Sequence, residues 1–194
     1  MIEARKLGRT YGTKHVIRDL DLDVGRGDFL LLTGPNGSGK TTLLRLIAGL
    51  LVPTAGELDV RAPRERIGFL GHEPLVYREL TAIENLDLYG RLYRVAERRE
   101  RIGMLLERFD LWEARNQRAD SFSRGMLQRL ALCRTLLHEP ELLVLDEPFS
   151  ALDEDGAALL DRELGELRLH ATFVVSTHDP DRLEPLSSQR LAFA

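Results

Sequence analysis

The sequence contains very little cysteine and no long apolar run. Its 194 residues include a single cysteine, Cys133, which excludes an intramolecular disulfide and fits a reducing compartment. No apolar run approaches the roughly 20 residues that a membrane-spanning helix needs. Residues 1–6 contain no apolar signal core. These absences predict a soluble cytoplasmic protein or a peripheral subunit of a membrane complex.

The chain also lacks an excess of positive charge. It carries 27 basic and 31 acidic residues, for a net charge of −4. Nucleic-acid-binding surfaces are usually basic, so we expect no nucleic-acid partner. Hydrophobic residues make up 43% of the chain, which is enough for a sizeable core. The length favours one domain over residues 1–194, with room for an inserted subdomain.

The most informative stretch is the glycine-rich segment 34–42. The apolar run 29–33 before it is typical of a buried strand, and residues 43–50 after it are typical of a helix. Strand, glycine-rich loop and helix form the context of a phosphate-binding loop, and the spacing matches G-x-x-x-x-G-K-[ST]. The residues expected to hold phosphates are Gly34, Pro35, Asn36, Gly37, Ser38, Gly39, Lys40, Thr41 and Thr42.

Two side chains of this loop have separate expected roles. Lys40 can reach the β- and γ-phosphates of a nucleotide, and the Thr41 hydroxyl can ligand Mg²⁺. The alternative is an ordinary glycine turn before a helix. The complete pattern and both flanking elements argue against that alternative.

An acidic pair follows a second buried strand. Four apolar residues, 142–145, lead into Asp146 and Glu147. Asp146 would hold Mg²⁺ directly or through water, and Glu147 would orient and deprotonate an attacking water. The alternative is a structural acidic turn, which the phosphate-binding loop upstream makes weak. A further buried strand, 172–177, ends at His178.

The rest of the chain is less specific. Residues 2–7 and 16–24 predict a small antiparallel sheet, with Tyr11 in the turn between them. By residue type alone, Tyr11 is more often a packing residue than a platform for a nucleotide base. Residues 80–120 predict charged helices, with a capping box at Thr81 and Glu84, and a further helix opens near residue 121 and runs to about residue 138.

Together these motifs resemble the nucleotide-binding subunits of ABC transporters over nearly the whole chain. Residues 34–41 resemble Walker A, 142–147 Walker B and 150–153 the D-loop. Residues 122–126 stand where the family has its signature, His178 where it has its switch histidine and Tyr11 where it has its base-stacking aromatic. The motifs occur in the order found in the family, which makes the resemblance specific. The resemblance therefore favours a base-stacking role for Tyr11 over a packing role.

The resemblance implies an α/β P-loop NTPase fold. It has a RecA-like core, a small antiparallel β subdomain and an inserted α-helical subdomain at about residues 73–138. It also implies a head-to-tail homodimer, with ATP and Mg²⁺ held between the P-loop of one subunit and the signature of the other. The catalytic residues would be Glu147, His178 and Lys40, and the partner's ATP would meet Ser123, Arg124, Gly125 and Asp153.

Two positions depart from the family pattern. His72 stands where the family usually has the glutamine of its Q-loop. An imidazole is shorter than that amide and differently aimed, so a Mg²⁺ contact from His72 stays open, while a role in coupling to a membrane partner is retained. In the signature, Arg124 replaces a glycine and Met126 a glutamine. Arg124 would add positive charge near the partner's phosphates or point to solvent, and harmless drift is the alternative at both positions.

Four segments narrow the resemblance to the ATPase subunit of the haem exporter of cytochrome c maturation: residues 71–74, 80–86, 123–126 and 145–153. That family pairs its ATPase with an integral membrane permease at the cytoplasmic face of the cell membrane. The sequence has no Cys-x-x-Cys-His, so we expect no direct haem binding. The alternatives are the ATPase of a drug, lipid or peptide exporter and, from another class, a soluble ABC protein of ribosome or DNA metabolism.

Overall fold

The computed structural model describes residues 1–193. The strands are β1 (Ile2–Tyr11), β2 (Lys14–Val24), β3 (Phe29–Thr33), β4 (Ala55–Val60), β5 (Ile67–Leu70), β6 (Leu142–Asp146), β7 (Thr172–Ser176) and β8 (Gln189–Ala192). The helices are α1 (Lys40–Ile47), α2 (Ala82–Leu92), α3 (Arg98–Arg108), α4 (Arg124–Leu136), α5 (Glu154–Leu167) and α6 (Pro180–Leu183). Short 3₁₀ turns lie at Arg64–Arg66, Ala119–Ser121 and Glu184–Leu186. No helix within residues 1–193 combines the length and the apolar character that crossing a bilayer requires.

A five-stranded parallel sheet forms the centre of the molecule, in the order β5-β6-β7-β3-β8. Every residue of β3, β6 and β7 is buried, as expected for strands covered on both faces. The strand β8 lies at one edge of this sheet, beside β3.

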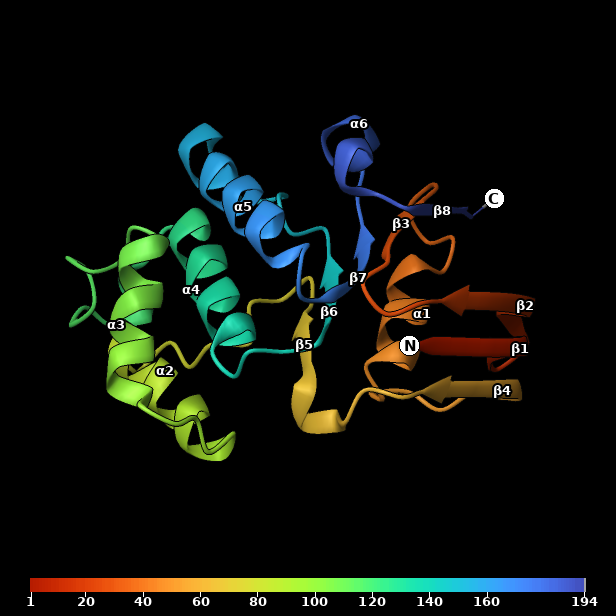
Figure 1. The fold of residues 1–194 in the computed structure, drawn as a ribbon, viewed down its shortest axis with the longest axis horizontal. Helices are drawn as coiled ribbons and strands as arrows, with labels where there is room; N and C mark the ends of the chain where they lie inside the picture. Colours follow the sequence, from red (N-terminus) through yellow and green to blue (C-terminus); the bar gives the residue numbers. More distant parts are fainter. Residues whose placement is uncertain (194) are drawn as a thin grey trace.

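Successive residues of these strands enter two different cores, because side chains alternate across a sheet. On one side, Leu30, Leu32 and Val144 pack against α1 and the small antiparallel sheet, whose order is β2-β1-β4. On the other side, Phe29, Leu31 and Leu143 pack against the helices α2 to α5. Figure 1 shows α1 between the two sheets. The central sheet is therefore held rigidly, and its strand ends provide fixed positions for a site.

The helices α2, α3 and α4 lie together on the side of the central sheet away from the small sheet (Figure 1). The predicted capping box is confirmed. Thr81 Oγ1 accepts from the backbone N–H of Glu84, and Glu84 Oε2 accepts from the N–H of Thr81. Helix α4 begins at Arg124, three residues later than predicted. The reason is that Ser123, in an extended conformation, caps the helix by accepting from the N–H of Met126.

Candidate nucleotide-binding site

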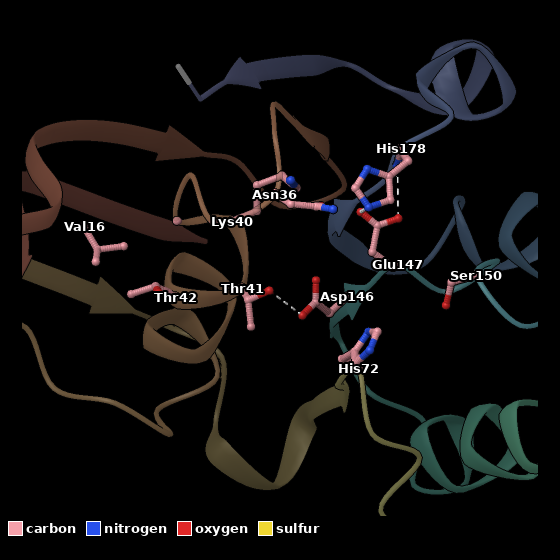
Figure 2. Close-up of a pocket in the computed structure, with 12 residues that line it drawn as sticks. Val16, Asn36, Lys40, Thr41, Thr42, His72, Asp146, Glu147, Ser150 and His178 are labelled. Carbon is pink, nitrogen blue, oxygen red and sulfur yellow. Dashed lines mark hydrogen bonds and ion pairs between the residues drawn. The ribbon is translucent and has the colours of Figure 1, made fainter. Parts of the chain in front are cut away.

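A cavity of about 460 Å³ opens beyond the carboxyl ends of β3, β6 and β7. In open parallel sheets this edge is the usual position of a ligand site. The size lies within the range of small-molecule pockets, roughly 300–1,000 Å³. Figure 2 shows the labelled side chains gathered around it. The lining residues are Val16, Asn36, Gly37, Gly39, Lys40, Thr41, Thr42, His72, Asp146, Glu147, Ser150 and His178.

The glycine-rich loop runs from the end of β3 to Lys40, the first residue of α1. Gly34, Gly37 and Gly39 all have positive φ, which a glycine adopts at little cost and other residues do not. Lys40 is almost fully buried, and its ammonium donates to the carbonyl oxygens of Gly34 at 2.7 Å and Pro35 at 3.0 Å. The charge is thus held inside the loop, at the positive end of the α1 dipole.

The loop also contains a buried hydroxyl that could accept a ligand. Ser38 Oγ is inaccessible to solvent and has no hydrogen-bond partner among residues 1–193. Buried polar atoms are nearly always satisfied in folded proteins, so such an atom in a phosphate-type loop fits the presence of a bound anion.

Thr41 and Asp146 meet across the cavity although they are 105 residues apart. Thr41 Oγ1 donates to Asp146 Oδ2 at 2.8 Å, as drawn in Figure 2. Hydroxyl and carboxylate oxygens are the ligands that Mg²⁺ prefers, with the remaining positions left to water and substrate phosphates. Residues 1–193 contain no group of three or more His, Cys, Asp or Glu side chains that would cage a metal alone. The residues present therefore fit a Mg²⁺ ion that arrives with a nucleotide.

His72 lines the same cavity. Figure 2 shows it near Asp146, on the side away from Glu147 in that view.

Glu147 follows β6 directly and adopts a left-handed backbone conformation, with φ of 50°. This conformation is uncommon for residues other than glycine. It is held by the Glu147 N–H, which donates to Ser176 Oγ at 3.0 Å. Glu147 Oε2 accepts from the backbone N–H of His178 at 3.0 Å, while His178 Nε2 lies 3.3 Å from Oε1 without hydrogen-bond geometry.

Burial raises the pKa of the Glu147 carboxyl above its ordinary value. The charges of His178 and Lys40 and the His178 N–H act in the opposite direction but do not cancel this effect. A carboxylate with a raised pKa in a polar cavity is suited to accept a proton from water.

Other predicted site residues lie away from the cavity lining. Tyr11 is 43% exposed, and the Arg9 guanidinium lies 4.7 Å above its ring. Ser123 caps α4, so Arg124 and Gly125 form its first turn. Asp153 caps α5 by accepting from the N–H of Gly156 at 2.9 Å. One chain therefore gathers the P-loop, Asp146, Glu147 and His178 around the cavity, whereas Ser123, Arg124, Gly125 and Asp153 are not part of its lining.

Sequence reasoning missed Ser176. Its hydroxyl is fully buried and donates to Asp146 Oδ1 at 2.6 Å while it accepts from the N–H of Glu147. The available signal was a hydroxyl residue near the end of an otherwise apolar strand, but its partner could be found only from the pairing of β6 with β7.

Comparisons with known proteins agree with this geometry. The profile of the ABC transporter family matches residues 17–150. The chain is 39% identical over 184 residues to the ABC transporter ATP-binding protein YxlF of Bacillus subtilis (strain 168), covering 92% of this chain and 62% of that protein. It is 43% identical over 161 residues to the daunorubicin resistance ATP-binding protein DrrA3 of Streptomyces coeruleorubidus, covering 77% of this chain and 51% of that protein. The Nod factor export ATP-binding protein I of Cupriavidus pinatubonensis (strain JMP 134 / LMG 1197) is 36% identical over 198 residues, covering 96% and 61%. The chain thus spans between half and two thirds of the length of these relatives.

A solved structure shares the fold over the full chain. It is a dimer of an ATP-binding cassette in a post-hydrolysis state with ADP and phosphate bound. The TM-score is 0.91 at 28% identity, and the match covers 100% of this chain and 94% of that one. The predicted α/β P-loop fold of the ABC ATPases is confirmed. The chain belongs to the ATP-binding proteins of the ABC transporter family.

Proposed function

We propose that this chain binds and hydrolyses ATP to energise an exporter whose permease is a separate integral membrane subunit. The observation that carries the proposal is the content of one cavity. It holds a phosphate-type loop with the buried Lys40, the Thr41–Asp146 oxygen pair, and the carboxylate of Glu147 beside His178. Such a set serves in-line transfer of a phosphoryl group to water.

The proposed mechanism follows from these positions. Lys40 and the N–H groups of the loop bind the β- and γ-phosphates and carry charge that develops on them. Thr41 and Asp146 would hold Mg²⁺, which would supply Lewis-acid stabilisation of phosphate oxygens. Glu147 accepts the proton of the attacking water, and His178, fixed to Glu147 through its N–H, orients that carboxylate and faces the γ-phosphate.

We infer that the functional unit is a head-to-tail dimer with two ATP molecules at its interface. In this arrangement Ser123, Arg124, Gly125 and Asp153 of one subunit complete the cavity of the other. Their position outside the cavity of their own chain supports the proposal, as does the dimeric cassette that shares this fold. The first turn of α4 offers free N–H groups to a γ-phosphate. Tyr11, exposed at the end of β1, would stack on the adenine base.

The permease would bind at the helical subdomain, about residues 73–138, and at the groove around residues 72–84. His72 lines the nucleotide cavity and is the first residue of this segment, so it would report the state of the nucleotide to the permease. The chain would accordingly act at the cytoplasmic face of the cell membrane.

The names of the relatives give different cargoes, so they do not identify the cargo of this chain. Two concern drug resistance and Nod factor export, and others concern maltose or sulfate import. Haem export for cytochrome c maturation is our specific proposal. It rests on segments 71–74, 80–86, 123–126 and 145–153, with the permease, not this chain, contacting haem. Export of a drug, lipid or peptide is the alternative.

The ATPase proposal is tested with Glu147→Gln. This substitution preserves the shape of the side chain but removes the proton acceptor. We expect ATP binding near the wild-type value and a fall in turnover on the order of 10²–10⁴-fold. Equilibrium binding of ATP and steady-state release of phosphate measure the two effects. Undiminished hydrolysis by this variant would refute the assignment of Glu147.

The cargo is tested in cells that lack the protein, by a haem stain for covalent c-type cytochromes. Loss of the stain that only the wild-type copy restores, and not the Glu147→Gln copy, would support haem export. Normal staining without the protein would assign the ATPase to another exporter. Sedimentation of the chain with ribosomes and not with membranes would instead favour the soluble class.

A further inference from the structure

Arg182 joins three elements next to the proposed catalytic residues. It lies on α6, four residues after His178. Its Nε lies 3.0 and 3.1 Å from the two carboxylate oxygens of Asp161 on α5, and its Nη2 lies 2.6 Å from Oδ2. The same guanidinium lies over the ring of Phe149, with 4.7 Å from Cζ to the ring centroid.

Phe149 belongs to the loop between β6 and α5, which begins with Glu147. Inside this loop the N–H of Ser150 donates to the carbonyl of Glu147 at 3.1 Å, so Phe149 and Glu147 share one tight turn. The turn is also attached to α4, because Gln128 Nε2 donates to the carbonyl of Pro148 at 3.0 Å. Arg182 contacts the same turn through the Phe149 ring, and it belongs to the segment that carries His178.

The contact is too exposed to serve mainly as a stabilising interaction. The Arg182 and Asp161 side chains are 34% and 40% exposed, and ion pairs of this kind contribute little to folding. A fork of two N–H groups on one carboxylate nevertheless fixes the plane of the guanidinium, and that plane covers an aromatic ring. The geometry is therefore better suited to setting a position than to adding stability.

We propose that Arg182 is a positioning residue for ATP hydrolysis. Its guanidinium, fixed by Asp161, holds the Phe149 ring. This contact keeps the turn that contains Glu147 in its position beside His178. The inference rests on the proposed ATPase function. It agrees with a second cavity, of about 310 Å³, which Arg182 and Phe149 line together with Glu147, His178 and Asp153. Loss of the Arg182–Phe149 contact would change the distance between the Glu147 carboxylate and the His178 imidazole, and it would leave the P-loop unchanged.

The test compares Arg182→Met and Arg182→Lys with Arg162→Met, a matched change at an exposed arginine of α5. Methionine keeps an unbranched apolar stem but loses the charge and the guanidinium group, and lysine keeps the charge but not the planar fork. We expect kcat to fall about tenfold in both Arg182 variants, because small misplacements of reacting groups are costly in rate. KM for ATP should stay within about twofold, and Arg162→Met should match the wild type.

Two further variants separate positioning from folding. Phe149→Tyr retains the ring and should keep the wild-type kcat, whereas Phe149→Leu should show the loss seen in Arg182→Met. The double variant of Arg182→Met and Phe149→Leu should be no slower than either single one, because both break the same contact. Backbone hydrogen exchange in residues 149–152 and 177–179 should rise in Arg182→Met and not in Arg162→Met.

The two proposals fail in different ways. If the wild type hydrolyses ATP through Glu147 and Arg182→Met retains its kcat and its exchange pattern, the positioning role is wrong and the ATPase function stands. Equal losses in kcat and ATP affinity would also overturn the positioning role. If the wild-type chain binds and hydrolyses no ATP, the proposed function itself is wrong.

Discussion

Ser176 Oγ donates a 2.6 Å hydrogen bond to Asp146 Oδ1 and accepts a 3.0 Å hydrogen bond from the N–H of Glu147. One buried hydroxyl thus sets the carboxylate proposed to bind Mg²⁺ and the backbone of the proposed base. Asp146 is held on its other oxygen by Thr41. The consequence is that both acidic residues are fixed by the last residue of β7, two residues before His178.

Replacing Ser176 by alanine should therefore affect folding and catalysis together. Asp146 Oδ1 would lose a buried donor, while the Glu147 N–H would keep its 3.2 Å bond to the Ser176 carbonyl. A hydrogen bond to a charged group contributes about 1.5–3 kcal/mol. We expect a decrease of that order in the free energy of unfolding, measured in urea, and a lower kcat. Ser187→Ala, which removes an exposed hydroxyl bonded to the Glu184 carbonyl, is the control. Equal stability of the two variants would contradict this reading.

The Lys40→Ala substitution should weaken ATP binding. Lys40 places a buried ammonium within the loop, and its contacts to the Gly34 and Pro35 carbonyls show that it points along the loop interior. Loss of a charge-assisted contact of about 1.5–3 kcal/mol predicts a rise in Kd for ATP of roughly ten- to a hundredfold. Titration calorimetry measures it, with Lys14→Ala on exposed β2 as control. An unchanged Kd for ATP would show that Lys40 does not contribute to ATP binding.

As the pH is lowered, the rate of hydrolysis should begin to fall at a higher pH than it would with a glutamate of ordinary pKa. Burial raises the pKa of Glu147, and the group must be deprotonated to accept a proton. Activity is therefore present above the raised pKa and is lost as the pH falls through it. The pH profile of kcat measures this acidic limb.

Removing His178 should move the acidic limb further upward. The charge of His178 lowers the pKa of Glu147, so His178→Ala leaves the effect of burial less opposed. The comparison uses the residual activity of the variant across the same pH range. A limb that shifts downward would show that the imidazole does not favour the ionised carboxylate.

Gly34→Ala should be far more harmful than Gly37→Ala, although both glycines have positive φ. A methyl group at Gly34 would clash with the carbonyl oxygen of Phe193, whereas a methyl group at Gly37 would meet nothing within 4 Å. We expect about 1 kcal/mol of destabilisation from backbone strain at Gly37 and several times that at Gly34. Thermal unfolding of the two variants checks the difference. Similar unfolding temperatures would mean that the Phe193 backbone can move away from the added methyl group at little cost in free energy.

Much of the fold could be predicted from local patterns. Apolar runs such as 29–33 and 142–145 identified the buried strands, because a parallel strand covered on both faces needs no polar alternation. The spacing within 34–42 identified the phosphate-type loop, since its glycines and Lys40 are sequence neighbours. Thr81 and Glu84 identified a helix start for the same reason, because both partners of a capping box lie within one turn.

What only the tertiary structure decided are the contacts between distant segments. The bonds from Thr41 and Ser176 to Asp146 cross 105 and 30 residues, and they depend on the strand order β6-β7-β3. The Arg182–Asp161 contact depends on the approach of α6 to α5. Periodicity and spacing describe which face a residue occupies in its own element. They do not say which elements become neighbours, because that choice is made by the packing of the two cores as a whole.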